Sequence, residues 1–297
     1  MKLIMSKMGR KKIIINADDF GINSVVTKAI EDMIAKGIVT STTIMANGAC
    51  LDDVKRVYDK YPDVSYGIHL CIAEFDSITK SEILHQYGLT DGNGVFIKKE
   101  LWNLKSFPDD LKHALYEELC AQIELVQSYG ICLSHADSHQ LVHTTFIELQ
   151  DIFIKALKKY KIEKVRIGEE VRPIRILFNN VKRIVRSENN VGMQTVNDNS
   201  KSHGDSLGIL NRLKGLILAW RKSLIITKSY RSSFKTVDYF YSVHDFFHSH
   251  PRNGNYNYEL MCHPGHPALE YTTEIDELLT SSIFRDSSIQ LISYKAL

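Results

Sequence analysis

The sequence predicts an α/β protein folded as a single parallel β/α barrel, on three observations. Residues 13–70 alternate between short β-branched runs and segments of helical periodicity, an order that implies parallel strands with helices packed outside them. Strand-like runs return near the C-terminus. Ionisable side chains follow several predicted strands, as expected where chemistry gathers at the carboxyl ends of parallel strands. One domain, 1–297, accounts for this pattern better than two.

The first elements follow from hydrophobic spacing and from the residues that end each segment. Three successive isoleucines at 13–15 predict a buried first strand. Apolar residues at helical spacing after Ser24, a typical N-cap residue, predict a helix that ends at Gly37. The next predicted elements are a strand at 38–45, a helix at 51–58 and a strand at 64–70.

A long insertion or lid is predicted after the third strand, at 71–107. The β/α alternation lapses there, and Asp-Gly-Asn-Gly at 91–94 is a strong turn signal. Residues 109–129 align leucines and isoleucines on one face and predict an amphipathic helix. The other predicted elements are strands at 131–135, 165–167, 258–262 and 289–294 and helices at 146–160 and 274–283. Residues 175–208 are polar and weakly periodic, and no element is assigned to them.

Composition and charge exclude some classes of protein. Lys and Arg total 37 and Asp and Glu total 35, and this formal net charge of +2 argues against a nucleic-acid binder. No stretch approaches the ~18 apolar residues of a membrane span, and the N-terminus has no apolar run of signal-peptide length. Five cysteines, an odd number without closely spaced pairs, suit a reducing compartment. We therefore expect a cytoplasmic protein.

Two adjacent carboxylates, Asp18 and Asp19, follow the first predicted strand. Neighbouring residues on an extended chain point to opposite faces, so one carboxylate could bind a metal while the other acts as a base beside it. An ordinary capped turn is the alternative. His69, at the end of the third strand, is either a ligand or a core histidine.

His135, Asp137 and His139 form a second polar cluster. On an extended strand the two histidines would lie about 13 Å apart at ~3.3 Å per residue, too far to bind one ion together. They approach one another only if the chain turns after Asp137; alternatively one binds metal and the other contacts substrate. Asp137 is well placed to orient an imidazole. His263, in a Pro-Gly turn, is either a proton donor or part of a capped turn.

Two imidazoles, one carboxylate and an open position make up a catalytic zinc-type site. The same ligands can hold other divalent ions, so the expected cofactor is one ion, Zn²⁺ or Mg²⁺. Such an ion polarises a carbonyl and lowers the pKa of its bound water toward ~7. The spare aspartate could accept the water's proton, and His263 could protonate the leaving group.

Six short blocks stand out along the chain, each occurring once and in a definite order. They are 16–21 (Asn-Ala-Asp-Asp-Phe-Gly), 37–42, 47–48, 67–70 (Gly-Ile-His-Leu), 135–143 and 261–265 (Met-Cys-His-Pro-Gly). This ordered set resembles the YdjC-like carbohydrate deacetylases, which include chitooligosaccharide deacetylases. The resemblance spans nearly the whole chain.

The resemblance implies a distorted β/α barrel that hydrolyses an N-acetyl group from an amino sugar. By motif, Asp19, His69 and His139 match the family's metal ligands. Asp18 matches the catalytic base and His263 the proposed acid. The cluster residues at 135 and 137 would bind substrate or support the ligands.

The expected partner is an N-acetylated saccharide in an oligosaccharide, a polysaccharide precursor or a glycolipid, with no nucleic acid. Two other functions stay open. A glycoside hydrolase would need a pair of carboxylates across the scissile bond. A non-catalytic carbohydrate-binding barrel would need no base at all. The sequence also leaves a homodimer open.

Residues 207–230 combine apolar residues near helical spacing with Arg212, Lys214, Arg221 and Lys222. One interpretation is an outer barrel helix whose apolar face packs on the core. The other is a basic amphipathic helix that makes weak contact with an anionic membrane surface.

Overall fold

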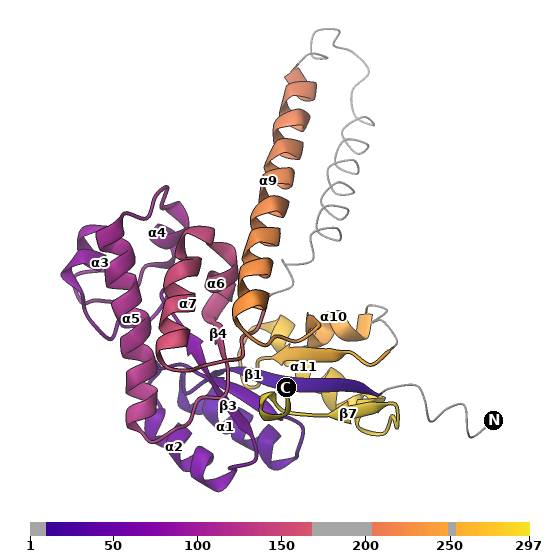
Figure 1. Ribbon diagram of the computed structural model, residues 1–297. Helices are drawn as coiled ribbons and strands as arrows, with labels where there is room; N and C mark the ends of the chain where they lie inside the picture. The colour runs from indigo at the N-terminus through magenta and orange to yellow at the C-terminus, as the bar shows by residue number, and fades with distance from the viewer. Residues whose placement is uncertain (1–9, 168–203, 249–253) are drawn as a thin grey trace.

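A seven-stranded parallel sheet forms the centre of the computed structural model, which describes residues 10–167, 204–248 and 254–297 (Figure 1). The strand order is β4-β3-β2-β1-β6-β5, and β7 pairs with the start of β1. The strands are β1 (Lys11–Phe20), β2 (Ser41–Ile44), β3 (Ser65–Leu70), β4 (Ala136–Ser138), β5 (Tyr239–Ser242), β6 (Asn257–Cys262) and β7 (Ile289–Leu291). Each described pairing between these strands is parallel.

The sheet curls into a distorted, TIM-like half-barrel, which confirms the predicted fold class. Single parallel bridges continue from β4: Ala136 pairs with Val165, and Lys164 pairs with Lys235, shortly before β5. These bridges extend from the edge strand β4 to a residue of the segment that leads into β5, the other edge strand. β1 is central and buried from Ile13 to Phe20, as a strand covered on both faces must be.

Helices pack outside the sheet, as the alternating pattern predicts (Figure 1). Those with clear periodicity are confirmed: α1 (Ser24–Ala35), α2 (Leu51–Lys60), α5 (Asp109–Ser128), α7 (Gln150–Lys159) and α11 (Leu269–Thr280). The N-cap of α1 is Asn23 rather than Ser24, because the Asn23 side chain accepts a hydrogen bond from the Val26 N–H at 2.9 Å. The predicted insertion contains two short helices, α3 (Glu82–Gln86) and α4 (Lys98–Asn103).

Four sequence predictions need correction. The strand predicted at 131–135 is wrong: β4 begins at Ala136, because the ladder forms only opposite residues 68–70 of β3. The strand predicted at 165–167 is reduced to isolated bridges. The first strand, predicted at 13–15, is longer: β1 runs from Lys11 to Phe20 and includes both aspartates. The helix predicted at 146–160 begins later: residues 147–149 form a 3₁₀ turn and α7 covers Gln150–Lys159, while a short helix, α6 (Val142–Thr145), precedes both.

Besides α6, the sequence did not predict β5 or α10 (Val243–His248). Part of the unassigned stretch 175–208 lies outside the described residues. From Gly204 the chain forms α9 (Gly204–Ser233), a long helix that extends away from the sheet (Figure 1). Its C-terminal turns pack on the barrel through buried Ile226 and Tyr230. The core-packing interpretation of 207–230 therefore holds for that end of the helix. Within the described ranges, no helix is long and apolar enough to cross a membrane.

Candidate active site

A cavity of about 470 Å³ opens at the carboxyl ends of the central strands. Five predicted site residues line it together: Asp18, Asp19, His69, His139 and His263. They come from β1, from β3, from the turn after β4 and from the end of β6, positions spread over the whole chain. The parallel sheet brings these strand ends to one rim, as the sequence predicts.

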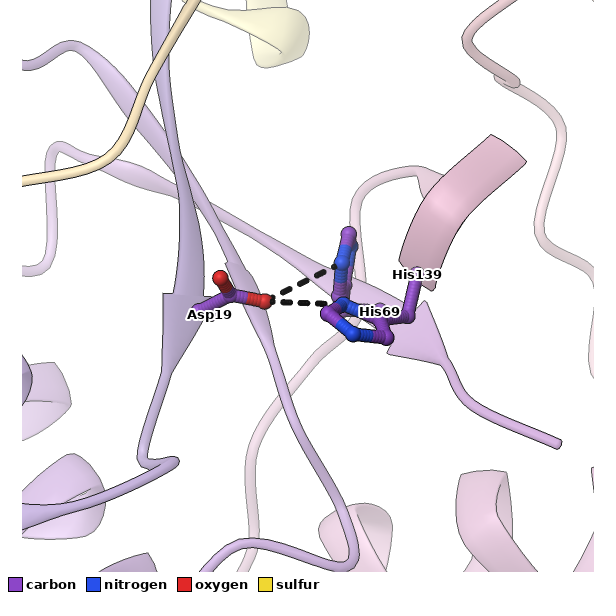
Figure 2. A group of neighbouring side chains, drawn as sticks. All are labelled: Asp19, His69 and His139. Atoms are coloured by element: carbon purple, nitrogen blue, oxygen red, sulfur yellow. Dashed lines mark hydrogen bonds and ion pairs between the residues drawn. The ribbon is translucent and has the colours of Figure 1, made fainter. Parts of the chain in front are cut away.

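Asp19, His69 and His139 converge on one point of this cavity (Figure 2). One oxygen of Asp19 lies 3.4 Å from His69 Nε2 and 3.2 Å from His139 Nδ1. Asp19 has a left-handed backbone (φ 66°) where the pairing of β1 with β2 becomes irregular. Aspartate tolerates this region better than most residues, and the kink separates its side chain from that of Asp18.

The spacing of this group suits a divalent cation. Ligand atoms at 2.0–2.1 Å from a tetrahedral ion lie about 3.3 Å from one another, which is close to both distances from Asp19. The three ligand atoms all lie within 4.8 Å of each other, and all three side chains are buried or nearly so. The donor set of two imidazoles and one carboxylate fits Zn²⁺ and also other divalent ions.

Carboxylates behind the group orient both imidazoles. His69 Nδ1 lies 2.6 Å from Asp137, which leaves Nε2 facing Asp19. His139 Nε2 lies 3.1 Å from Glu74, which leaves Nδ1 facing Asp19. The role predicted for Asp137 as an orienting carboxylate matches this geometry. Glu74 was missed, because it lies in the insertion and belongs to no motif in the sequence.

Asp19, His69 and His139 shift one another's pKa values. Burial alone would raise the pKa of Asp19, but hydrogen bonds from His139 and His69 hold it well below its ordinary value. Burial alone would lower the pKa of His69, yet Asp137 raises it well above its ordinary value. The pKa of His139 also rises against burial, owing to Asp19 and Glu74. A cation would have to displace protons from these imidazoles, so its affinity should increase with pH.

Asp18 lines the same cavity beside this group and is held by Arg166. Two guanidinium nitrogens donate to the Asp18 carboxylate at 2.6 and 2.7 Å. The same guanidinium contacts Asp137 at 2.7 Å and Glu259 at 2.7 Å, and it is fully buried. Burial would lower the pKa of Arg166, but Asp137, Asp18 and Glu259 keep it well above its ordinary value. The same guanidinium bridges Asp18 and Asp137, which together with His69 form a second trio of possible ligands whose atoms lie within 4.8 Å of one another.

Arg166 is the main site residue that the sequence did not predict. The one available signal was its position in the short apolar segment 165–167. Its three carboxylate partners come from β1, β4 and β6, and no local pattern connects them.

His135 lies behind the cavity rather than in it. Its ring is fully buried and stacks on Tyr294 with centroids 3.7 Å apart. Its Nε2 lies 3.1 Å from the side-chain oxygen of Asn16, whose amide donates to Asp18 at 2.9 Å. Burial lowers the pKa of His135 to about 3, so the ring is neutral. Full burial behind Asn16 favours a supporting role for His135 over contact with substrate.

His263 lies across the cavity beside an acidic partner. Its Nδ1 lies 3.3 Å from Glu274 of α11, and its ring packs on Tyr271 with centroids 4.0 Å apart. Burial alone would lower the pKa of His263, but the hydrogen bond to Glu274 and the charges of Asp18 and Asp19 raise it. The imidazole thus tends to carry a proton into the cavity.

The fold and the site define an α/β half-barrel with a candidate metal centre at the carboxyl ends of its strands. The chain belongs to the YdjC-like protein family, whose model matches residues 12–289.

The chain is also similar in sequence to several curated proteins and in fold to a solved structure. A carbohydrate deacetylase of Vibrio cholerae is 32% identical over 158 residues, which are 53% of this chain and 59% of that protein. The carbohydrate deacetylase of Vibrio parahaemolyticus is 34% identical over 152 residues, 51% of this chain and 57% of the relative. The match thus spans somewhat more than half the length of these relatives. A proposed cellobiose-phosphate cleavage protein of Enterococcus faecalis V583 shares the fold, with a TM-score of 0.64 at 20% identity over 97% of this chain and 99% of that one.

Proposed function

We propose that this protein is a metal-dependent hydrolase that removes an N-acetyl group from an amino sugar. The observation that carries the proposal is the cavity itself, where two imidazoles and one carboxylate converge beside a second carboxylate and a histidine. The relatives named carbohydrate deacetylase support the same activity.

Asp19, His69 and His139 would hold the divalent ion. The ion would supply Lewis-acid polarisation of the amide carbonyl and make an attacking water more acidic. Asp137 and Glu74 would keep the two imidazole rings in the orientation that presents their free nitrogens to the ion.

Asp18 and His263 would move the protons. The two hydrogen bonds from Arg166 fix the Asp18 carboxylate, which would accept a proton from the attacking water. His263, whose pKa is raised by the hydrogen bond to Glu274 against the effect of burial, would donate a proton to the departing amine nitrogen. An amine leaves poorly without that proton, so base and acid are both needed for amide hydrolysis.

The alternative functions explain fewer of these contacts. A glycoside hydrolase works with two carboxyl groups on either side of a sugar bond, whereas Asp19 is engaged by two histidines and Asp18 by an arginine. A non-catalytic sugar-binding barrel would have no use for a buried acid–histidine pair across the cavity.

The test is release of acetate from N-acetyl sugars, their oligomers and lipid-linked saccharides, with and without a chelator. We expect acetate from at least one of them, loss of activity on chelation, and recovery with Zn²⁺ or Mg²⁺. Elemental analysis should find one divalent ion per chain. Stoichiometric metal in a variant with Asp19→Ala and His69→Ala would contradict the assigned ligands, and cleavage of the sugar linkage without acetate would overturn the proposal.

A further inference from the structure

A second group of possible metal ligands lies outside the active-site cavity, where α10 packs against α11. It consists of His244 and His248 of α10 and Glu277 of α11. Positions four apart in a helix lie on the same face, so both imidazoles meet the same carboxylate. One possible ligand atom from each residue lies within 4.8 Å of the other two.

The three side chains are close to the spacing that a tetrahedral ion needs. His244 Nδ1 lies 3.0 Å from Glu277 Oε1, and His248 Nδ1 lies 3.9 Å from the same oxygen. Ligand atoms at 2.0–2.1 Å from a tetrahedral ion lie about 3.3 Å apart, so shifts of about 0.6 Å or less are required. The two rings stack with centroids 4.1 Å apart. His248 Nδ1 would release a 2.9 Å hydrogen bond to the His244 carbonyl, which costs little at an exposed position.

The carboxylate of Glu277 needs more positive charge than its neighbours supply. Its Oε1 faces the two histidines, whereas Oε2 is buried and accepts no hydrogen bond from the described residues. In the same part of the chain, no lysine or arginine forms an ion pair with Glu277. A buried carboxylate oxygen without a donor is costly, and a divalent ion held by the same carboxylate would offset that cost.

The donor set favours Zn²⁺ over Mg²⁺. Two imidazoles and one carboxylate are typical ligands of an open zinc site, whereas Mg²⁺ prefers an octahedral set of oxygens. The side chains of His244 and His248 are 55% and 60% exposed, so water can complete the coordination. An ion at such an open position exchanges with solvent, unlike one held by the buried residues of the active site.

We propose that His244, His248 and Glu277 form a second, exchangeable Zn²⁺ site that clamps α10 to α11. Zn²⁺ binding there does not depend on the proposed function. We call this group the α10–α11 site.

The α10–α11 site lies close to the catalytic cavity. A cavity of about 350 Å³, lined by both helices, shares Met261 and Tyr271 with the active-site cavity. Glu277 also follows Glu274 by one turn of α11, and Glu274 is the partner of His263. An ion at the α10–α11 site therefore stabilises the helix that carries this partner.

Equilibrium dialysis of the purified protein against Zn²⁺ measures the α10–α11 site directly. We expect two ions per chain at saturation and one after gel filtration, because the exposed ion is lost. Excess Mg²⁺ should not displace the exchangeable ion. His248→Gln should weaken its binding at least about tenfold, the scale on which loss of even a supporting partner weakens a metal site.

His113→Gln is the matched control. His113 is also an exposed histidine on a helix, with its Nε2 3.2 Å from Glu117. This pair belongs to no group of three ligands among the described residues, so the variant should retain both ions.

The Asp19→Ala, His69→Ala variant separates the α10–α11 site from the active site. Added Zn²⁺ should bind at one ion per chain and raise the Tm, because the ion binds the packed pair of helices. Adding His248→Gln should abolish both effects. After gel filtration the variant should contain no stoichiometric metal, as the proposed function also requires. If the variant does not fold, the Zn²⁺-dependent rise in Tm is compared between His248→Gln and His113→Gln in the otherwise wild-type protein.

The outcomes separate the two proposals. Absence of an exchangeable ion in the wild type, or its retention in His248→Gln, would overturn the α10–α11 site. Equal losses in His248→Gln and His113→Gln would overturn it too. Since the readouts are ion content and Tm, a failure to release acetate would refute the deacetylase and leave the α10–α11 site intact.

Discussion

At the scale of single residues, the adjacent aspartates have different surroundings. Asp19 contacts two histidines, and Asp18 contacts Arg166 and Asn16. We expect Asp18→Asn to retain the metal and lose roughly 10²–10⁴-fold in kcat, the usual scale of general-base catalysis. Asp19→Asn should lose metal affinity as well, because an amide is a weaker ligand than a carboxylate.

Metal content and kcat of both variants check this division. Thermal melts serve as the control, because Asp18→Asn also removes one of three carboxylate partners of a buried guanidinium. If both variants lose metal equally while remaining folded, the division of roles is incorrect.

His263 can be tested through the leaving group. Since proton donation acts in the transition state, His263→Ala should lower kcat far more than it changes KM. The loss should shrink for an activated acetyl ester, whose leaving group needs little protonation. Glu274→Gln should show the same trend more weakly, because it removes the partner that raises the pKa of His263. An equal loss on amide and ester would indicate a structural role for His263.

Site residues that follow a strand were predictable, and those that complete the network from a distance were not. Asp18, Asp19 and His69 each end a strand, so the parallel topology places them at one rim. Arg166 follows an isolated bridge, and Glu74 lies in the insertion. Their partners lie 148 and 65 positions away, at Asp18 and His139 respectively. Such contacts depend on tertiary packing, which a single sequence does not encode locally.

At the scale of elements, α9 presents one packed and one exposed side. Exposed Ile217, Leu218, Leu224 and Ile225 lie on the side away from the barrel. Arg221 and Lys228 are exposed on this same side. Lys222 instead forms an ion pair with Glu148 at 3.3 Å. An apolar face with basic residues suits weak adsorption to an anionic lipid surface.

Liposome sedimentation tests this adsorption. At low salt we expect weak binding to anionic but not to neutral vesicles, and Arg221→Glu with Lys228→Glu should weaken it at least about tenfold, since each basic residue near the surface contributes about 1 kcal/mol. Reversing Lys36 and Lys161, exposed lysines elsewhere on the molecule, matches the change in net charge and should have a smaller effect. Absence of binding to anionic vesicles would exclude the membrane hypothesis.

The elements also show where sequence patterns are sufficient. The helix predicted at 109–129 agrees with α5 to within one residue, because twenty residues of amphipathic spacing leave little ambiguity. The strand predicted at 131–135 forms instead at residues 136–138, as β4. Apolar composition does not determine which residues pair with the neighbouring strand. Short strands depend on their partners, whereas long amphipathic helices mostly do not.

At the scale of the whole molecule, the alternating pattern was enough to predict the barrel, but not the buried polar interior that fixes its pH response. His135 and His143 lie under the sheet rim, and burial lowers their pKa to about 3 and about 4. His143 is held between Ser138 Oγ at 2.6 Å and the Arg166 carbonyl at 2.7 Å. Both rings stay neutral in the fold at pH values where an unfolded chain, with a histidine pKa near ~6.5, is protonated.

The unfolded state therefore binds more protons than the native state between pH 6.5 and the folded pKa of each ring. The free energy of unfolding should fall as pH decreases from about 6.5, by up to ~1.4 kcal/mol per pH unit for each buried ring. The contribution of His143 ends near pH 4 and that of His135 near pH 3. Histidines 69, 139 and 263 have raised pKa values, and their protonation stabilises the fold as pH decreases. The contribution of one buried ring is therefore measured as the difference in pH dependence between the wild type and a variant that lacks that ring.

Denaturant unfolding of metal-free protein at several pH values between 6.5 and 4.5 measures that difference. His135→Gln removes one neutral buried ring and should reduce the dependence of unfolding free energy on pH by about 1 kcal/mol per unit, whatever it does to stability at pH 7. His113→Gln, at a position with 67% side-chain exposure, should leave the dependence unchanged. The same pH dependence in His135→Gln as in the wild type would mean that His135 is protonated in the folded barrel, contrary to its burial against Tyr294.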